Sequence, residues 1–79
     1  KQVGDREYVL SCRLEVEYLN QEYDFEIEES EEYDTLAGYI INNYDGIPTS
    51  GTVIVTDKLE IKVLRTTRTR VELARVKVR

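Results

Sequence analysis

The acidic segment that spans residues 24–34 contains the side chains whose type suits metal binding. The candidate ligands are Asp24, Glu26, Glu28, Glu29 and Glu31. Mg²⁺ and Ca²⁺ take carboxylate oxygens, but this spacing does not match the 12-residue loop of an EF-hand. We therefore interpret the segment as a solvated acidic loop whose Phe25 and Ile27 enter the core, with an adventitious divalent cation as the alternative.

Other kinds of reactive site find little support in the residue types. The chain has no histidine and one cysteine, Cys12, so it offers no internal disulfide, no Cys/His cluster for zinc and no base beside the thiol. Carboxylates without a recognisable pocket are not evidence of acid–base chemistry. We expect Cys12 to be a small core residue and the domain to be non-catalytic.

The charge of the chain is strongly asymmetric. Residues 1–34 carry twelve acidic and three basic side chains, a net charge of −9, and residues 35–79 carry four acidic and eight basic ones, a net charge of +4. The basic region consists of Arg65, Arg68, Arg70, Arg75, Lys77 and Arg79. We interpret it mainly as the electrostatic partner of the acidic half, with contact to phosphates or to a membrane surface as the alternative. Nucleic-acid binding is not expected of an acidic chain with few aromatic residues on these strands.

Candidate interaction residues come from the tyrosines and from the basic region. Tyrosine is favoured at interfaces because it offers apolar area with a polar tip. Tyr33 lies just before the predicted central helix and Tyr39 lies off its buried face, so both are candidates, together with Arg65 and Arg68. Half-buried edges of the core are the simpler interpretation of the tyrosines.

These residues must be positioned by a single small domain, since 79 residues support only one core. Residues 1–6 are expected to be a flexible lead-in, and residues 8–13 a short strand at the edge or end of a sheet. Val16, Leu19 and Tyr23 recur at helical spacing, which predicts a short amphipathic helix. The apolar runs are too short for a membrane-spanning helix, so we expect this fragment to be soluble.

The central helix is the best-defined element. Asp34 or Thr35 can cap its start. Its predicted buried face consists of Leu36, Ala37, Ile40, Ile41 and Tyr44. Gly46 lies where a left-handed residue would end the helix, and Pro48 cannot continue it.

After residue 52 the apolar period changes from about 3.6 to 2, which predicts an antiparallel meander. Its strands are expected at residues 53–55, 59–63 and 70–79, with turns near 57–58 and 67–69. In the last strand two apolar residues are odd-numbered and two are even-numbered: Val71, Leu73, Val76 and Val78. Since strand side chains alternate, placing all four on one face requires a β-bulge near residues 74–75.

These residues carry a family resemblance. The run Tyr33-Asp34-Thr35-Leu36-Ala37-Gly38, followed by Gly46-Ile47-Pro48 and Gly51 and by the two apolar strands, resembles the CorC/HlyC-type transporter-associated domain. Residues 8–23 also resemble that family's short strand and helix, so the likeness covers essentially the whole chain, 1–79, as one domain.

The resemblance implies an α+β fold, in which a short N-terminal strand and helix precede a capped helix packed on a three-stranded antiparallel β-meander. This fold is similar to part of the FAD-binding domains of the vanillyl-alcohol-oxidase type. FAD itself is not expected, because none of the four glycines forms a phosphate-cradling G-x-G-x-x-G.

The resemblance also implies a functional context. The family's domains are cytosolic modules at the inner face of the bacterial membrane, in hemolysin-like proteins that also carry a transmembrane domain and a CBS-domain pair. Such proteins are associated with magnesium and cobalt efflux. The implied role is regulation of ion transport by docking to the CBS pair or to a second copy as a homodimer. The alternative is a small-ligand sensor that binds a divalent cation, an adenine nucleotide or flavin.

Overall fold

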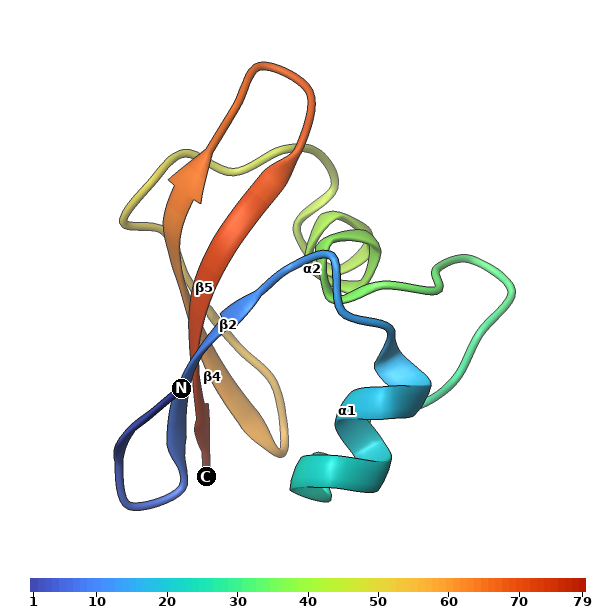
Figure 1. Cartoon of the computed structure of the whole chain (residues 1–79). Helices are drawn as coiled ribbons and strands as arrows, with labels where there is room; N and C mark the ends of the chain where they lie inside the picture. The colour runs from blue at the N-terminus through green and yellow to red at the C-terminus, as the bar shows by residue number, and fades with distance from the viewer.

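A computed structural model describes all residues, 1–79, as an α+β fold with one antiparallel sheet and two helices (Figure 1). The elements are β1 (Gln2–Gly4), β2 (Glu7–Ser11), α1 (Val16–Tyr23), α2 (Leu36–Tyr44), β3 (Val53–Val55), β4 (Leu59–Thr66) and β5 (Val71–Val78). The strand order is β1-β2-β5-β4-β3, with every neighbouring pair antiparallel. Neither helix has the length and apolar content needed to cross a bilayer.

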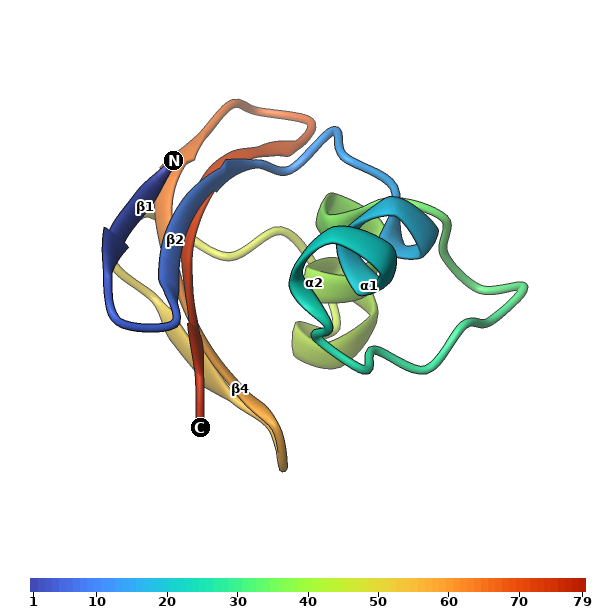
Figure 2. The same cartoon turned by 60° about the horizontal axis from the view of Figure 1, so that its bottom comes forward.

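Both helices lie on the same side of the curved sheet, and the core lies between them and the strands (Figure 2). In β4 the residues Leu59, Ile61 and Val63 are buried, while their neighbours Glu60 and Lys62 are exposed. This alternation is the predicted pattern of a strand with one face in the core. The other core residues are Leu10, Cys12, Val16, Leu19, Phe25, Ile27, Leu36, Ile40, Ile54, Val71, Ala74 and Val76.

The N-terminal prediction is wrong, because residues expected to be a flexible lead-in form the strand β1. The backbone N–H of Val9 donates to the Lys1 carbonyl at 2.8 Å, and the Lys1 ammonium donates back to the Val9 carbonyl at 2.9 Å. Arg6, at φ 57°, allows the tight turn between the strands. The strand β2 is therefore an interior strand and not an edge strand, and the predicted three-stranded meander is part of a sheet of five.

The two helices begin beside each other, and the first N–H group of each donates to a main-chain carbonyl outside the helix. The N–H of Val16 donates to the Asp34 carbonyl at 2.8 Å, and that of Leu36 donates to the Leu14 carbonyl at 2.9 Å. The Thr35 hydroxyl caps α2 by accepting from the Gly38 N–H at 3.2 Å. Because the first N–H groups of a helix have no partner within it, these bonds fix both helix starts together.

The end of α2 differs from the prediction in two respects. The left-handed residue that ends the helix is Asp45, at φ 66°, one residue before the predicted Gly46, because the short side chain of aspartate tolerates this conformation. Gly46 follows with a positive φ of 138°. The N–H groups of both residues reach the Ile41 carbonyl, at 2.8 and 3.3 Å. Tyr44 is 47% exposed and lies outside the core, since its phenol reaches water where the helix ends. The predicted core positions Leu36 and Ile40 are confirmed.

The register of β5 also corrects the prediction. Pairing passes from Val63–Ala74 to Arg65–Leu73, which leaves an extra residue on β4, and then to Thr66–Val71, which leaves an extra residue on β5. The irregularities therefore lie at residues 64 and 72, and the pairing of residues 73–77 with β2 is regular. Small Ala74 occupies the core position that was assigned to Leu73, and so Leu73 and Val76 point to opposite faces.

Candidate functional site

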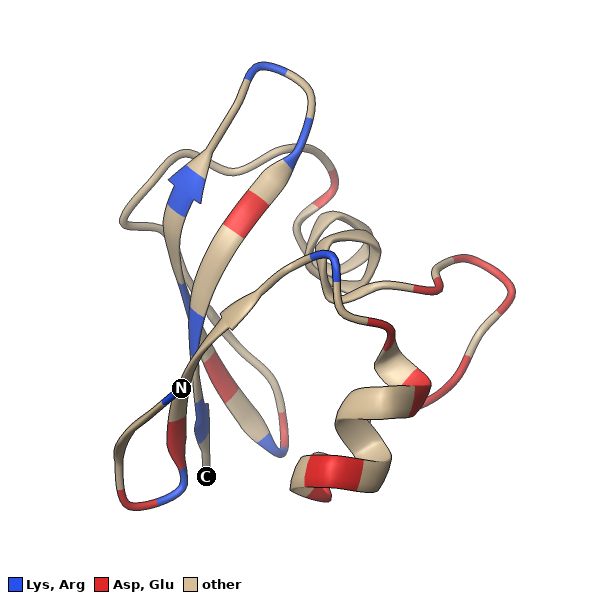
Figure 3. Cartoon of the chain, viewed as in Figure 1, with Lys and Arg blue, Asp and Glu red and all other residues tan.

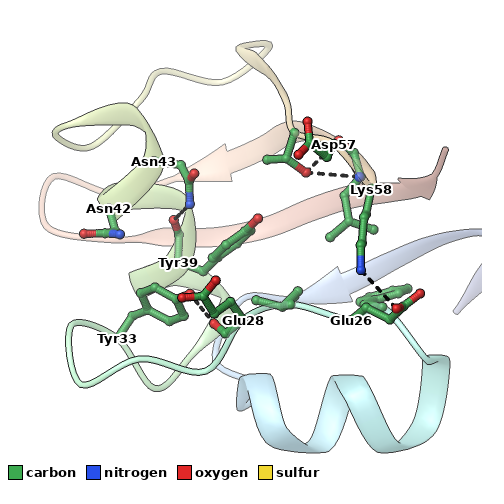
Figure 4. Close-up of a pocket in the computed structure, with 12 residues that line it drawn as sticks. Glu26, Glu28, Tyr33, Tyr39, Asn42, Asn43, Asp57 and Lys58 are labelled. Atoms are coloured by element: carbon green, nitrogen blue, oxygen red, sulfur yellow. Dashed lines mark hydrogen bonds and ion pairs between the residues drawn. The ribbon is translucent and has the colours of Figure 1, made fainter.

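The main cavity of the domain is an open depression of about 380 Å³, here called the tyrosine groove (Figure 4). It lies between the segment that joins α1 to α2 (residues 24–35, here called the connector), the exposed side of α2 and the turn that joins β3 to β4. Its lining residues are Phe25, Glu26, Ile27, Glu28, Tyr33, Tyr39, Asn42, Asn43, Thr56, Asp57, Lys58 and Leu59. A volume in this range suits a small ligand or a few side chains of a partner.

One side-chain amide holds the connector that forms the first wall. Asn20, on α1, donates from Nδ2 to the Ile27 carbonyl at 2.8 Å and accepts from the Ile27 N–H at 2.9 Å. With the backbone fixed at this point, Phe25 and Ile27 are buried, as predicted, and Glu26 and Glu28 face solvent. The role of Asn20 was missed because its partner lies seven residues away in a segment without regular structure.

The second wall is an aromatic pair. The ring centroids of Tyr33 and Tyr39 lie 5.3 Å apart with planes at 71°, which is an edge-to-face arrangement. The Tyr33 hydroxyl donates to the Glu28 carbonyl, and the Asn43 amide donates to the Tyr39 carbonyl at 2.8 Å. Gly38 allows the close approach, because a Cβ at this position would lie 2.9 Å from the Tyr33 Cβ.

The protonation state of Tyr33 follows from its surroundings. Partial burial, with smaller contributions from Tyr39 and Glu28, raises the pKa of its phenol. Tyr33 is therefore protonated at neutral pH and remains a hydrogen-bond donor to the connector. The hydrogen bond from the Tyr33 hydroxyl to the Glu28 carbonyl therefore holds the Tyr33 ring in place.

The charges of the groove do not balance. Lys58 pairs with Glu26, Nζ to Oε1 at 3.0 Å, between two largely exposed side chains. Glu28 and Asp57 make no ion pair. Three carboxylates and one ammonium leave a net charge of −2 on the lining.

The five candidate metal ligands remain dispersed along the connector. No group of three or more His, Cys, Asp or Glu side chains in the chain is close enough together to hold a metal ion. Glu26 is engaged by Lys58, Glu28 lines the tyrosine groove, and Glu29 lines a smaller depression beside the start of α1. Asp24 is the left-handed residue that ends α1. Glu31 lines neither depression.

Of the four candidate interaction residues, the structure brings together Tyr33 and Tyr39 but not the arginines. Arg65 lies 3.8 Å from Glu72, and Arg68 lies in the β4–β5 turn without an ion pair. Neither arginine lines the groove.

The acidic and basic halves are in contact, because β2 pairs with β5 and two of the three ion pairs join them. Most of their charged side chains nevertheless form no ion pair, contrary to the interpretation that the basic region mainly pairs with the acidic half. Figure 3 shows many carboxylates on α1 and the connector, and basic residues mainly on the strands and their turns, where a few carboxylates also lie. Glu26 is the one residue of the acidic segment in an ion pair, and Glu7 forms the other pair between the halves, with Arg75 at 3.6 Å. Long exposed side chains gain little from pairing in water, so electrostatic attraction alone did not determine the packing.

Two further groups predicted from the sequence serve the core. Cys12 is buried, and burial together with the nearby Glu72 carboxylate raises its pKa to about 12, so the thiol is unreactive at neutral pH. Tyr8 and Tyr23 pack with Phe25 at centroid distances of 5.9 and 5.3 Å. This cluster fixes the inner side of the connector beneath the groove.

Solved structures share this arrangement along nearly their whole length. A structure described as a Mg²⁺ and Co²⁺ transporter (CorC)-associated region of Neisseria meningitidis MC58 has a TM-score of 0.86 at 24% identity, covering 99% of this chain and 95% of that chain. A transporter-associated domain from a CBS domain protein of Porphyromonas gingivalis has a TM-score of 0.79 at 18% identity, covering 98% and 93%. The corresponding domain of a Xylella fastidiosa Temecula1 hemolysin, solved in complex with Mg²⁺ and Mn²⁺, has a TM-score of 0.77 at 19% identity, covering 92% and 87%.

The fold is thus that of a transporter-associated domain. A family model with this description, CorC_HlyC, matches residues 1–79, and the chain belongs to the CorC_HlyC family. The resemblance that was based on the helix start, the Gly-x-Pro turn and the apolar strands is confirmed. No protein of curated function is detectably similar to the chain in sequence.

Proposed function

We propose that this domain is a non-catalytic regulatory and interaction module, at the cytosolic face of the bacterial inner membrane, in a hemolysin-like CBS-domain protein of magnesium- or cobalt-type ion transport. The observation that carries the proposal is the family match over the whole chain. Similar folds come from a region described as associated with a Mg²⁺ and Co²⁺ transporter and from a CBS domain protein, and this agrees with such a parent.

The distribution of residues supports docking better than chemistry. The polar side chains that line the tyrosine groove are carboxylates, amides, phenols, the Thr56 hydroxyl and one lysine that is already paired. The buried thiol of Cys12 is protonated at neutral pH. A half-buried aromatic pair beside unpaired carboxylates is a surface that suits contact with another protein. The partners we propose are the CBS pair and the transmembrane domain of the parent chain.

The test uses the parent protein in sealed vesicles, with residues 1–79 present or replaced by a flexible linker. Mg²⁺ efflux is measured over a range of internal Mg²⁺ concentrations. A regulatory module predicts that efflux persists without the domain but that its dependence on Mg²⁺ concentration changes. Identical curves would refute regulation, and complete loss of efflux from correctly inserted protein would make the domain part of the transport machinery.

A second candidate function is a small-ligand sensor for a divalent cation or for an adenine nucleotide or flavin. The observation that favours the cation is the Xylella fastidiosa hemolysin domain solved with Mg²⁺ and Mn²⁺. The dispersed carboxylates of this chain favour weak cation binding over a built site. Calorimetric titration with Mg²⁺, Mn²⁺, ATP and FAD separates the two functions, because the sensor requires a saturable isotherm with one of them.

A further inference from the structure

The tyrosine groove carries unbalanced negative charge beside a half-buried aromatic pair. Glu28 and Asp57 lie on different walls, and neither has an ion-pair partner. The only cationic residue in the lining, Lys58 of the β3–β4 turn, is held by Glu26 of the connector. A positively charged group in the groove would therefore meet two free carboxylates without having to displace an existing partner.

The aromatic wall suits the same charge. A guanidinium group stacks on the face of a tyrosine ring and gains from its quadrupole. Tyr33 is held by its bond to the Glu28 carbonyl, and Tyr39 by edge-to-face packing on Tyr33, so both rings are positioned before a ligand arrives. Asn42 adds an exposed amide that makes no hydrogen bond within the chain. Its oxygen can accept from one of the five guanidinium N–H donors.

The connector also offers main-chain donors. The backbone N–H groups of Glu26 and Glu28 donate no hydrogen bond within the chain, whereas the N–H of Ile27 between them is taken by Asn20. A peptide lying along this wall can supply carbonyl acceptors to these donors. A free organic cation cannot, and phosphate groups would be repelled by the carboxylates.

Resting on the proposed docking function, we infer that the tyrosine groove binds an arginine side chain presented by an extended segment of a partner protein. The guanidinium lies between Glu28 and Asp57 with its plane against Tyr39, and the neighbouring peptide carbonyls face the connector. The inference thereby assigns the docking surface and the chemistry of its partner.

The experiment titrates ¹⁵N-labelled domain with the tripeptide N-acetyl-Gly-Arg-Gly-amide and follows the backbone amide resonances. The control peptide carries citrulline, which is neutral and nearly isosteric with arginine. The arginine peptide is expected to shift the resonances of Glu28, Tyr39 and Asp57 saturably, and the citrulline peptide is not. Glu28→Gln and Asp57→Asn should each weaken binding by about threefold to fivefold, as expected for one partly exposed charge pair.

Glu31→Gln is the matched variant, because it removes one carboxylate of the same connector that does not line the groove. It should bind the arginine peptide as the unmodified domain does. Equal responses to the two peptides, equal weakening by Glu31→Gln, or the absence of any groove shift would overturn the inference. Tyr39→Leu provides a charge-neutral check, since it should also weaken binding if the ring contacts the guanidinium.

Other occupants give distinct results that would also overturn the inference. Groove resonances that move with protein concentration alone, and that stop moving in Arg68→Gln, would assign the groove to a second copy. Saturation by Mg²⁺ or tighter binding of spermidine would make it a site for free cations. These results concern the groove alone, whereas failure of the proposed function would appear in the efflux curves of the parent protein.

Discussion

Replacing Asn20 by alanine tests whether the connector depends on one side chain. The change removes both hydrogen bonds to Ile27 and leaves the N–H and carbonyl of that residue without their partners. Two such bonds contribute about 1–1.5 kcal/mol each. Because alanine favours the helix over asparagine by about 0.5 kcal/mol, the net expected loss in the free energy of unfolding is about 2 kcal/mol.

Urea unfolding followed by circular dichroism measures this loss, and Asn42→Ala is its control. Asn42 also lies on a helix, but its exposed amide makes no hydrogen bond within the chain. Its replacement should stabilise slightly through helix propensity. For a domain of this size, 2 kcal/mol corresponds to about 8–16 °C in melting temperature. A difference below about 0.5 kcal/mol between the two variants would refute the reasoning that Asn20 holds the connector.

Four further substitutions test the packing and the titration behaviour. Gly38→Ala should destabilise the domain by about 1 kcal/mol or more, measured by urea unfolding, despite the gain in helix propensity, because the new Cβ would lie 2.9 Å from the Tyr33 Cβ. Ala74→Leu should lower the free energy of unfolding by about 1–3 kcal/mol, because it overpacks a fully buried site. Leu73→Ala should lower it by less. The opposite order would support the register predicted from the sequence, in which Leu73 is the core residue. Folding raises the pKa of Cys12 from 9.0 to about 12, so the stabilisation that comes from its protonated thiol is complete below pH 9 and is lost between pH 9 and 12. In a urea-unfolding series over this pH range, the free energy of unfolding should therefore fall less steeply for Cys12→Ala than for the unmodified domain.

Elements with local apolar patterns could be predicted from the sequence. The start of α2 follows from Thr35 and its core face from Leu36 and Ile40, and the alternation of β4 gives the buried face directly. These signals are local, because capping and side-chain period depend on neighbouring residues only. The same residues carried the family resemblance.

The missed features depend on contacts between distant segments. The strand β1 has little apolar content of its own and forms because β2 offers an open edge. In the sequence, Leu73 is a stronger candidate for the core than its small neighbour Ala74. Only the irregular pairing of β5 with β4 places Ala74, and not Leu73, on the core face. The tyrosine groove combines Glu28, Tyr39 and Asp57 from three segments, so no single motif could have indicated it.

Stability and binding should separate at the groove. A free carboxylate such as Glu28 adds no interaction to the folded chain and repels its neighbours, so Glu28→Gln should change the unfolding free energy by less than about 0.5 kcal/mol. It should nevertheless weaken binding of the arginine peptide. Asn20→Ala, by contrast, should lower stability and binding together, because it releases the wall that carries Glu28. A residue that lowers binding without contributing to folding is what a binding surface requires, since sites of function are where a sequence departs from what stability alone would select. If Glu28→Gln destabilised the domain as much as Asn20→Ala, the Glu28 carboxylate would have a structural role. The argument that this carboxylate is free to bind a ligand in the groove would then fail.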